Sequence, residues 1–540
     1  MIINGFKDPF KIKDKPVIKS KKIITQQSLT FQKQFKKIEE INLNLKNNYY
    51  ILLYLGITVI FTVLCLQYEN YQSPFFEIFV FMLIFIIGSF CLYYYTKNEN
   101  NLHKVAFLII ILFGITCVFL TPVNDVSDEQ EHFVRSEIIS TGHISTDYIP
   151  IPNTTVKGYE TITSVTLLGQ NAGANVFTTD VDDAKINYTP SYFNSAFSQN
   201  PFYSYLPQAL GILLAKFLDL NAIWMLWLGR LFNLALYAGI VSLAIRKTPI
   251  LKFPMVVVSI LPLAIYQAAS LSVDGMFASF GILAFAYFLY FYKTPNLKWK
   301  DLGIFYGAII LSGLLKPPFL ALSLLIFMVP NDNFESITQN IISKLLILPT
   351  LAIGIAWSSY AASVLGNSWR GEFFAKNNVN ATQQLNYLIS NPGFAAERFG
   401  NIFTQFPVTV ERFFYFSNDV RDYSSTPLAV LYLIFFIVFS LIYPLEEKFK
   451  LKTRFEGFLI GFLIYCGVIG VQYLTWASIG AKSVMNGVFS RYFMPLLIFV
   501  PFIINTKFSK MDNENLSLIF LTIAISFISG MIMLTVAVKY

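Results

Sequence analysis

The densest group of ionisable side chains in the sequence follows an apolar run directly. Asp128, Glu129, Glu131, His132 and Arg135 recur at helical spacing, and Asp125 precedes them. On a helix, Asp128, His132 and Arg135 share one face, because residues i, i+4 and i+7 do so. A carboxylate at a membrane surface is partly desolvated, which raises its pKa toward that of a working general base. The alternative is an ordinary helix start, where the helix dipole also favours acids.

A second set of candidates consists of charges at or near the ends of apolar runs. They are Asp274, Arg230, Lys316 and Arg491, and Tyr492 follows the last of them. Charged side chains within a membrane are costly and are therefore functional candidates, although each could also be an interfacial cap that snorkels to water. Lys316 precedes two prolines, which break a helix and free backbone carbonyls.

Membrane helices must position these residues. Of 540 residues, 55% are apolar and only 13% are charged, whereas a soluble domain carries about 25% charged residues. The mean hydropathy of +0.55 predicts an all-α polytopic membrane protein. The net charge of +8 has a topological explanation and does not indicate a nucleic-acid partner. Three histidines in all, and no cysteine pair in a loop, exclude a His-rich zinc site and a disulfide framework.

Apolar runs of bilayer length predict thirteen spans if the N-terminus is cytoplasmic. Residues 1–49, with eleven Lys against four acids, form a basic cytoplasmic tail. Residues 50–103 add two N-terminal spans, 104–505 form the main membrane domain, and 506–540 hold the last span. The run 203–218 is predicted not to span, because only then do the basic loops between later spans fall inside.

This topology leaves two larger extracytoplasmic loops, 122–201 and 364–425. Apart from the tail, every cytoplasmic loop is too short for a nucleotide-binding fold, so chemistry is expected on the outer face. Of nine arginines, only Arg246 and Arg454 are expected inside. The excess outside suits a phosphate-bearing ligand, because the guanidinium binds phosphate with two parallel hydrogen bonds. Pairing with loop acids is the other explanation.

Several motifs resemble a known family in the same order along the chain. Pro-x-x-Asp-x-x-Asp-Glu-x-x-His-Phe-x-Arg from residue 122, followed by Thr-Gly-His, resembles the first outer loop of the bacterial membrane-protein family called domain of unknown function 2142. Later motifs of that family are similar to segments of residues 205–208, 228–233, 261–274 and 490–495. The resemblance covers about residues 105–505.

That family is similar to the GT-C glycosyltransferases, which move a sugar from a polyprenyl phosphate to an acceptor outside the cell. The resemblance implies a GT-C-like fold for residues 104–505 and an inverting reaction. It implies that Asp128 or Glu129 is the base, with Asp125 as a rival acid, and that Arg230 and Arg491, with Lys316, stabilise the leaving phosphate. Asp274 would orient the acceptor or a basic residue. The remaining substrate-binding candidates are His132, Arg135 and Tyr492.

The implied partners are a polyprenyl-phosphate-linked sugar, a cell-envelope glycan acceptor, the lipid bilayer and a separate enzyme that makes the lipid-linked sugar. Asp128, Glu129 and His132 are also a donor set for a Mg²⁺ or Mn²⁺ ion, although we assign no residue as a metal ligand. The expected location is a bacterial plasma membrane. Two other functions stay open: a transporter or flippase of lipid-linked sugars, and an envelope polysaccharide polymerase or ligase.

Overall fold

The computed structural model describes residues 48–66, 74–179, 183–404, 426–445, 447–484, 487–504 and 513–540. The chain divides into a short unit, residues 1–53, and a large unit, residues 54–540. Of the short unit, only the residues that begin helix α2 (Tyr49–Leu66) are described. The predicted basic tail therefore lies almost wholly outside the described residues.

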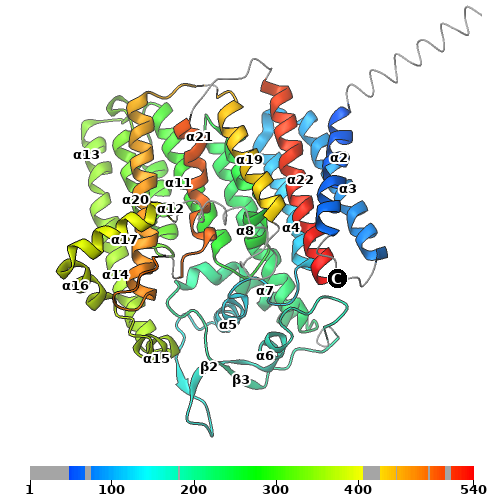
Figure 1. Ribbon diagram of the computed structural model, residues 1–540, viewed down its shortest axis with the longest axis vertical. Coiled ribbons are helices and arrows are strands. Elements are labelled where there is room, and N and C mark those ends of the chain that lie inside the picture. The colour runs from blue at the N-terminus through cyan, green and yellow to red at the C-terminus, as the bar shows by residue number, and fades with distance from the viewer. Residues whose placement is uncertain are drawn as a thin grey trace, which may run out of the picture. The chain divides into compact units, whose positions relative to one another are not determined.

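Long apolar helices make up most of the large unit (Figure 1). Among the described residues, seven helical segments are long and apolar enough to cross a membrane. They are α3 (Pro74–Lys97), η1 with α4 (Glu99–Asn101 and Leu102–Leu120), α8 (Ile223–Lys247), α11 (Asp274–Lys293), α13 with α14 (Ile337–Leu345 and Ile347–Gly366), α20 (Leu451–Trp476) and α22 (Asn513–Lys539). This architecture agrees with a polytopic helical membrane protein, and the count of thirteen spans stays a prediction.

Shorter apolar helices complete the bundle. They are α2, α12 (Trp299–Gly313), η3 (Pro317–Met328), α19 (Thr426–Ile442), η5 (Ser490–Ile498) and α21 (Phe499–Ile504). Helices α12 and η3 form a hairpin with Lys316 at its turn. Its other end is tied through the Leu297 N–H, which donates to the Asn333 carbonyl oxygen at 3.0 Å, beside η4 (Asn331–Asn333).

Residues 253–271 form one of the apolar runs counted among the thirteen predicted spans, but they contain two short helices. They are α9 (Lys252–Ser259) and α10 (Pro262–Ala268). Pro262 lacks an N–H group, so the helical hydrogen-bond ladder stops in front of it. Both pieces are buried, which is where a broken helix finds partners for its backbone within a membrane protein.

The described residues of 121–205 lie at one end of the helices, which we call the loop end (Figure 1). They contain α5 (Glu129–Ser140), α6 (Thr163–Gln170), η2 (Phe202–Tyr205) and three short strands, β1 (Ile149–Pro150), β2 (Lys157–Ile162) and β3 (Pro190–Phe193). The strands pair antiparallel in the order β1–β2–β3. An all-α description is therefore too simple for this segment.

Helix α7 (Leu206–Phe217) covers most of the run predicted not to span. Twelve residues rise about 18 Å, which is short of the roughly 30 Å hydrocarbon core. Its exposed side chains are apolar and recur at helical spacing: Leu206, Leu210, Leu213 and Phe217. This pattern is typical of a helix that rests on a lipid surface.

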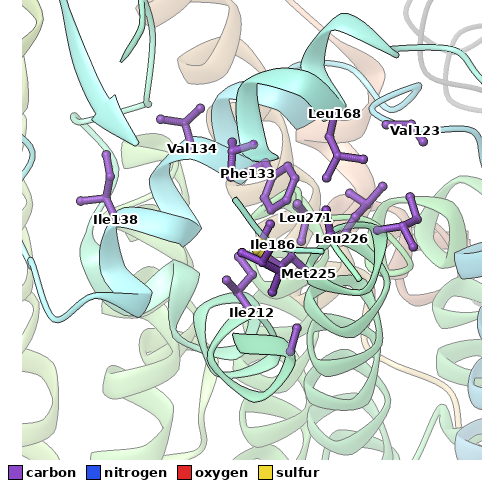
Figure 2. Packing of buried hydrophobic residues seen from close by; sticks show 14 of the residues in the cluster. Val123, Phe133, Val134, Ile138, Leu168, Ile186, Ile212, Met225, Leu226 and Leu271 are labelled. Atoms are coloured by element: carbon purple, nitrogen blue, oxygen red, sulfur yellow. The ribbon is translucent and has the colours of Figure 1, made fainter. Parts of the chain in front are cut away.

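A buried apolar cluster fixes α5 against the membrane helices (Figure 2). Phe133, Val134 and Ile138 of α5 pack with Ile212 of α7 and with α8 residues. Because hydrophobic burial holds one side of α5, the polar side chains at its beginning have a fixed direction.

Beyond α14, the predicted second outer loop is largely helical. It contains α15 (Trp369–Lys376), α16 (Ala381–Ser390) and α17 (Pro392–Thr404), and residues 405–425 lie outside the described part. Helix α22 packs beside α3 and α4.

Candidate functional site

Four charged residues from distant parts of the chain meet at the loop end. Asp128 Oδ2 lies 2.8 Å from Arg491 Nη2, and Asp274 Oδ2 lies 2.7 Å from Arg491 Nε. Lys316 Nζ lies 3.9 Å from Asp274 Oδ1 and 3.6 Å from the centre of the Tyr492 ring. We call Asp128, Asp274, Lys316 and Arg491 the acid–cation cluster. All four, and Tyr492, were candidates from sequence.

Asp128 directs its carboxylate into this cluster through an unusual backbone conformation. It is the residue before α5 and lies in the left-handed region, with φ 61° and ψ 12°. Aspartate tolerates this region better than most residues, but it still costs energy. The side chain does not cap the helix, as it would at an ordinary N-terminus, and is 38% exposed. The geometry therefore favours a ligand-facing role for Asp128.

Asp274 begins α11 and is held by the loop in front of it. Asn233 Nδ2 donates to the carbonyl oxygens of Ser270 and Ser272, at 2.8 and 2.9 Å. Gln208 Nε2 donates to the Leu271 carbonyl oxygen at 3.2 Å. Gln208, Asn233 and the residues before Asp274 belong to three of the family motifs found in the sequence. Together they form one scaffold, which presents Asp274 to Arg491.

Lys316 and Arg491 occupy breaks between helices. Lys316 is extended, with φ −136° and ψ 92°, as the residue before a proline prefers. Arg491 is the second residue of η5, and its side chain is only 5% exposed. Their cationic ends reach the cluster because a helix ends or begins at each position.

Glu129 is placed differently from its neighbour Asp128. Its carboxylate is fully buried and forms a bidentate ion pair with Arg230, with Nε–Oε1 at 2.8 Å and Nη2–Oε2 at 2.6 Å. The Leu271 N–H also donates to Glu129 Oε1 at 3.0 Å. A buried carboxylate with these partners joins α5, α8 and the loop before α11.

The Arg230 guanidinium has its hydrogen-bonding capacity filled within the protein. Besides Glu129, it donates to the carbonyl oxygens of Val118, Thr121 and Pro122. Five bonds match the five N–H groups of an arginine. Arg230 therefore holds the C-terminal end of α4 and has no N–H left for a phosphate in this arrangement.

Asp125, the rival acid, pairs with the last helix. Lys539 Nζ lies 2.6 Å from its Oδ1, and the Tyr266 hydroxyl donates to its Oδ2 at 3.5 Å. The Asp125 side chain is 15% exposed. This position is more enclosed than that of Asp128.

Two residues to which we assigned no role of their own from the sequence, Glu131 and Arg370, interact electrostatically with Asp128 of the cluster. Burial and the Asp128 charge raise the pKa of Glu131, and the Arg370 charge partly offsets this rise. Among the described residues, Glu131 forms no ion pair and the Arg370 guanidinium makes no hydrogen bond. Arg370 instead lies 4.6 Å from the centre of the Phe197 ring and 5.0 Å from that of Trp476.

The signal for both residues was present in the sequence. Glu131 lies in the acid-rich segment, and Arg370 is one of the arginines expected outside. Nothing in their spacing separates them from ordinary surface charges.

His132 is buried behind the cluster. Burial lowers its pKa to about 4, against the effect of the nearby Asp128 and Asp274 charges. Its Nδ1 lies 2.8 Å from the Tyr205 hydroxyl, which accepts a hydrogen bond from Asn200 Nδ2 at 2.9 Å. Arg135, one turn further along α5, turns away from the cluster and donates to the Ile144 carbonyl oxygen at 2.8 Å.

The carboxylates and histidine do not fit the divalent cation considered above. Glu129 is held by Arg230, Asp128 by Arg491, and His132 by Tyr205. Among the described residues, no group of three His, Cys, Asp or Glu side chains could hold a metal ion.

Comparisons with known proteins place the chain in a family. No curated protein and no solved structure matches it. A family model described as "Predicted membrane protein (DUF2142)" matches residues 111–500, a range that contains the whole acid–cation cluster. The chain therefore belongs to this family of membrane proteins.

Proposed function

We propose that the protein is an inverting glycosyltransferase that moves a sugar from a polyprenyl phosphate to an envelope glycan or a similar acceptor. The reaction would take place at the loop end, which we place on the extracytoplasmic side of a bacterial plasma membrane. The observation that carries the proposal is the 2.8 Å contact between Asp128 and Arg491. It sets an accessible carboxylate beside cations that suit a leaving phosphate.

Asp128 is the base in this proposal. An acceptor hydroxyl oxygen attacks the anomeric carbon and gives its proton to the Asp128 carboxylate, while the bond from that carbon to the phosphate oxygen breaks. One displacement inverts the anomeric configuration, and polyprenyl phosphate leaves as the anion. Glu131 is the second candidate base, because burial and the Asp128 charge raise its pKa and so make its carboxylate more basic.

The leaving phosphate would contact Lys316 and Arg370. Lys316 is 21% exposed and lies 3.9 Å from its nearest carboxylate oxygen, so it can approach a phosphate. Arg370 is stacked on aromatic rings and can use its planar fork on phosphate oxygens. Arg491 is held by Asp128 and Asp274, so it adds charge and keeps the base in position.

An apolar groove next to Arg491 suits the polyprenyl chain. It has a volume of about 540 Å³ and lies between α19, α20, η5 and α21. Phe493, two residues after Arg491, lines it, and the Phe493 ring centre lies 5.3 Å from that of Tyr465. Other aromatic lining residues are Phe403, Phe436, Phe458, Phe462 and Phe499. A chain in this groove would present its phosphate near Arg491.

The test uses the purified full-length protein in nanodiscs with radiolabelled polyprenyl-phosphate hexoses and crude cell-wall polymer. We expect release of free polyprenyl phosphate that survives Asp125→Asn and collapses in Asp128→Asn. If no donor is consumed but labelled lipid stays bound and Arg370→Gln abolishes that binding, a transporter of lipid-linked sugars replaces the transferase.

A further inference from the structure

A separate cavity lies at the loop end beside α14. Its volume is about 240 Å³. It is lined by Arg135, by the polar residues Ser145, Thr146 and Asn200, and by Trp357 and Tyr360 of α14. None of its lining residues carries a carboxylate, so the only formal charge at its wall is the guanidinium.

Three polar side-chain atoms at this cavity, on Arg135 and Thr146, are buried without a hydrogen-bond partner among the described residues. Arg135 is 2% exposed, and its Nε and Nη1 find no hydrogen-bond acceptor among the described residues. The hydroxyl of Thr146 is also buried and has no hydrogen-bond partner among the described residues. Buried donors almost always have a partner, because an unmet one costs about 1–3 kcal/mol. A ligand with acceptor oxygens would meet this need.

We infer that this cavity binds the small anionic headgroup of a membrane lipid. The guanidinium forms no ion pair among the described residues, and its free Nε and Nη1 donors suit an anion. The Thr146 hydroxyl can donate a further hydrogen bond to phosphate oxygens. A volume of about 240 Å³ has room for a phosphodiester with a short polar substituent. A choline headgroup would bring a cation next to Arg135 and is disfavoured.

The position of helix α14 favours a membrane lipid, and not a soluble anion, as the ligand. It belongs to one of the segments that can cross a membrane, of which only 22% is buried. Its side chains Leu351, Ile353 and Ile355 are exposed and apolar. Trp357 and Tyr360 come next along the helix, and their ring centres lie 5.2 Å from each other. Trp and Tyr are enriched at the level of lipid headgroups. Acyl chains along α14 would bring the headgroup to Arg135.

Three side chains connect this cavity with the acid–cation cluster. Asn200 lines the cavity and donates to the Tyr205 hydroxyl, which contacts His132. The His132 N–H donates to the Asp128 carbonyl oxygen at 3.1 Å. A bound lipid would therefore lie near the proposed base, on the α14 side and not in the α19–α20 groove. Because of this position, we assign the cavity to the headgroup of a lipid-anchored acceptor. This assignment rests on the proposed function.

The binding test uses the full-length protein in phosphatidylcholine nanodiscs with graded phosphatidylglycerol. Native mass spectrometry counts the retained phosphatidylglycerol, and thermal unfolding records its effect on Tm. We compare the wild type with Arg135→Gln and Thr146→Val. Lys185→Gln is the matched control. It also removes one positive charge from residues 121–205, but this charge belongs to an exposed ion pair with Asp219.

We expect the wild type and Lys185→Gln to retain one phosphatidylglycerol that Arg135→Gln loses, and Thr146→Val to bind it several-fold more weakly. Thr146→Val keeps the buried arginine, so it decides the question if Arg135→Gln fails to fold. Equal retention in all proteins would overturn the inference. So would inorganic phosphate that raises the Tm in pure phosphatidylcholine as much as phosphatidylglycerol does, because the source would then be soluble.

A second arm separates this inference from the proposed function. If the wild type releases polyprenyl phosphate, phosphatidylglycerol should alter that release in the wild type and not in Thr146→Val. No dependence on the lipid in either protein would overturn the acceptor assignment alone. If no donor is consumed at all, the binding arm still decides whether the cavity is a lipid site.

Discussion

Asp128 and Arg491 are 363 positions apart in the sequence, and their side chains meet at 2.8 Å. The contact joins the turn before α5 to the start of η5, and Arg491 also reaches Asp274. It therefore links the acid-rich segment to the membrane helices that carry the cations. Most of the proposed chemistry depends on this connection.

The first prediction concerns Asp128→Asn. Asparagine tolerates the left-handed backbone of this position and keeps the volume of the side chain, but it cannot take a proton as a base. We expect polyprenyl-phosphate release to fall about 10²–10⁴-fold, the usual contribution of a general base. Because the side chain is 38% exposed, the free energy of unfolding should change by less than about 1 kcal/mol.

Glu131→Gln and Asp125→Asn are the comparison variants for this measurement. Full activity of Asp128→Asn together with an inactive Glu131→Gln would transfer the role of base to Glu131. Loss of activity in Asp125→Asn alone would move the reaction to the Lys539 side of the segment.

The second prediction concerns the buried pair of Glu129 and Arg230. Both side chains are 0% exposed, and Glu129→Gln leaves the Arg230 charge without its counter-ion. Breaking a buried ion pair from one side costs about 3–5 kcal/mol, so a marked drop in the Tm of the detergent-solubilised protein is expected.

Asp219→Asn is the control for stability, because it breaks an exposed ion pair with Lys185 and should change the free energy of unfolding by about 0.5 kcal/mol or less. A Glu129→Gln protein with the wild-type Tm and no activity would show that Glu129 belongs to the reacting groups after all.

How far the sequence predicts this molecule differs between the fold and the site. Apolar runs of about 20 residues predict membrane helices well, because the bilayer imposes that length. They do not show where such a run breaks. Pro262 divides 253–271 into α9 and α10, whereas the turn of the α12–η3 hairpin does lie where the prolines after Lys316 predict a break. The strands of residues 149–193 are too short to give a clear alternating pattern.

For the site, residue type and membrane position selected Asp128, Asp274, Lys316 and Arg491 one at a time. Which carboxylate pairs with which cationic side chain depends on tertiary packing, and the spacing of residues along the sequence does not reveal it. Asp128 and Glu129 are neighbours in sequence and both acids, yet one is accessible and the other buried. Arg370 was not selected, since its burial between aromatic rings appears only in three dimensions.

The third prediction concerns the pH dependence that Glu131 causes. Burial and Asp128 raise its pKa above the ordinary 4.5, so the folded protein binds this proton more tightly than the unfolded chain. Stability from this group is present below pH 4.5 and falls as the pH rises through the folded-state pKa. Glu131→Gln should therefore unfold at a higher temperature than the wild type at pH 8 in nanodiscs.

The difference between these two proteins should vanish toward pH 4, where Glu131 is protonated in both states. A Glu131→Gln protein that is less stable than the wild type at pH 8 would mean that the carboxylate has a stabilising partner when it is charged.

The last prediction concerns the protonation state of His132. The Tyr205 hydroxyl accepts from Asn200 and can donate its own proton to His132 Nδ1, which lies 2.8 Å away. We expect a neutral imidazole with its proton on Nε2, in keeping with the pKa of about 4. The chain has three histidines, so ¹⁵N-histidine labelling gives few signals, and His132→Gln identifies the relevant one.

The same group should make the protein sensitive to mild acid. The folded-state pKa lies below the ordinary 6.5, so its stabilising effect is complete above pH 6.5 and is lost as the pH falls from 6.5 toward 4. A shift of this size corresponds to about 3 kcal/mol. His132→Gln should lose less stability than the wild type between pH 7 and pH 5. An imidazole that is charged at pH 6 in the folded protein would contradict both the tautomer and this difference.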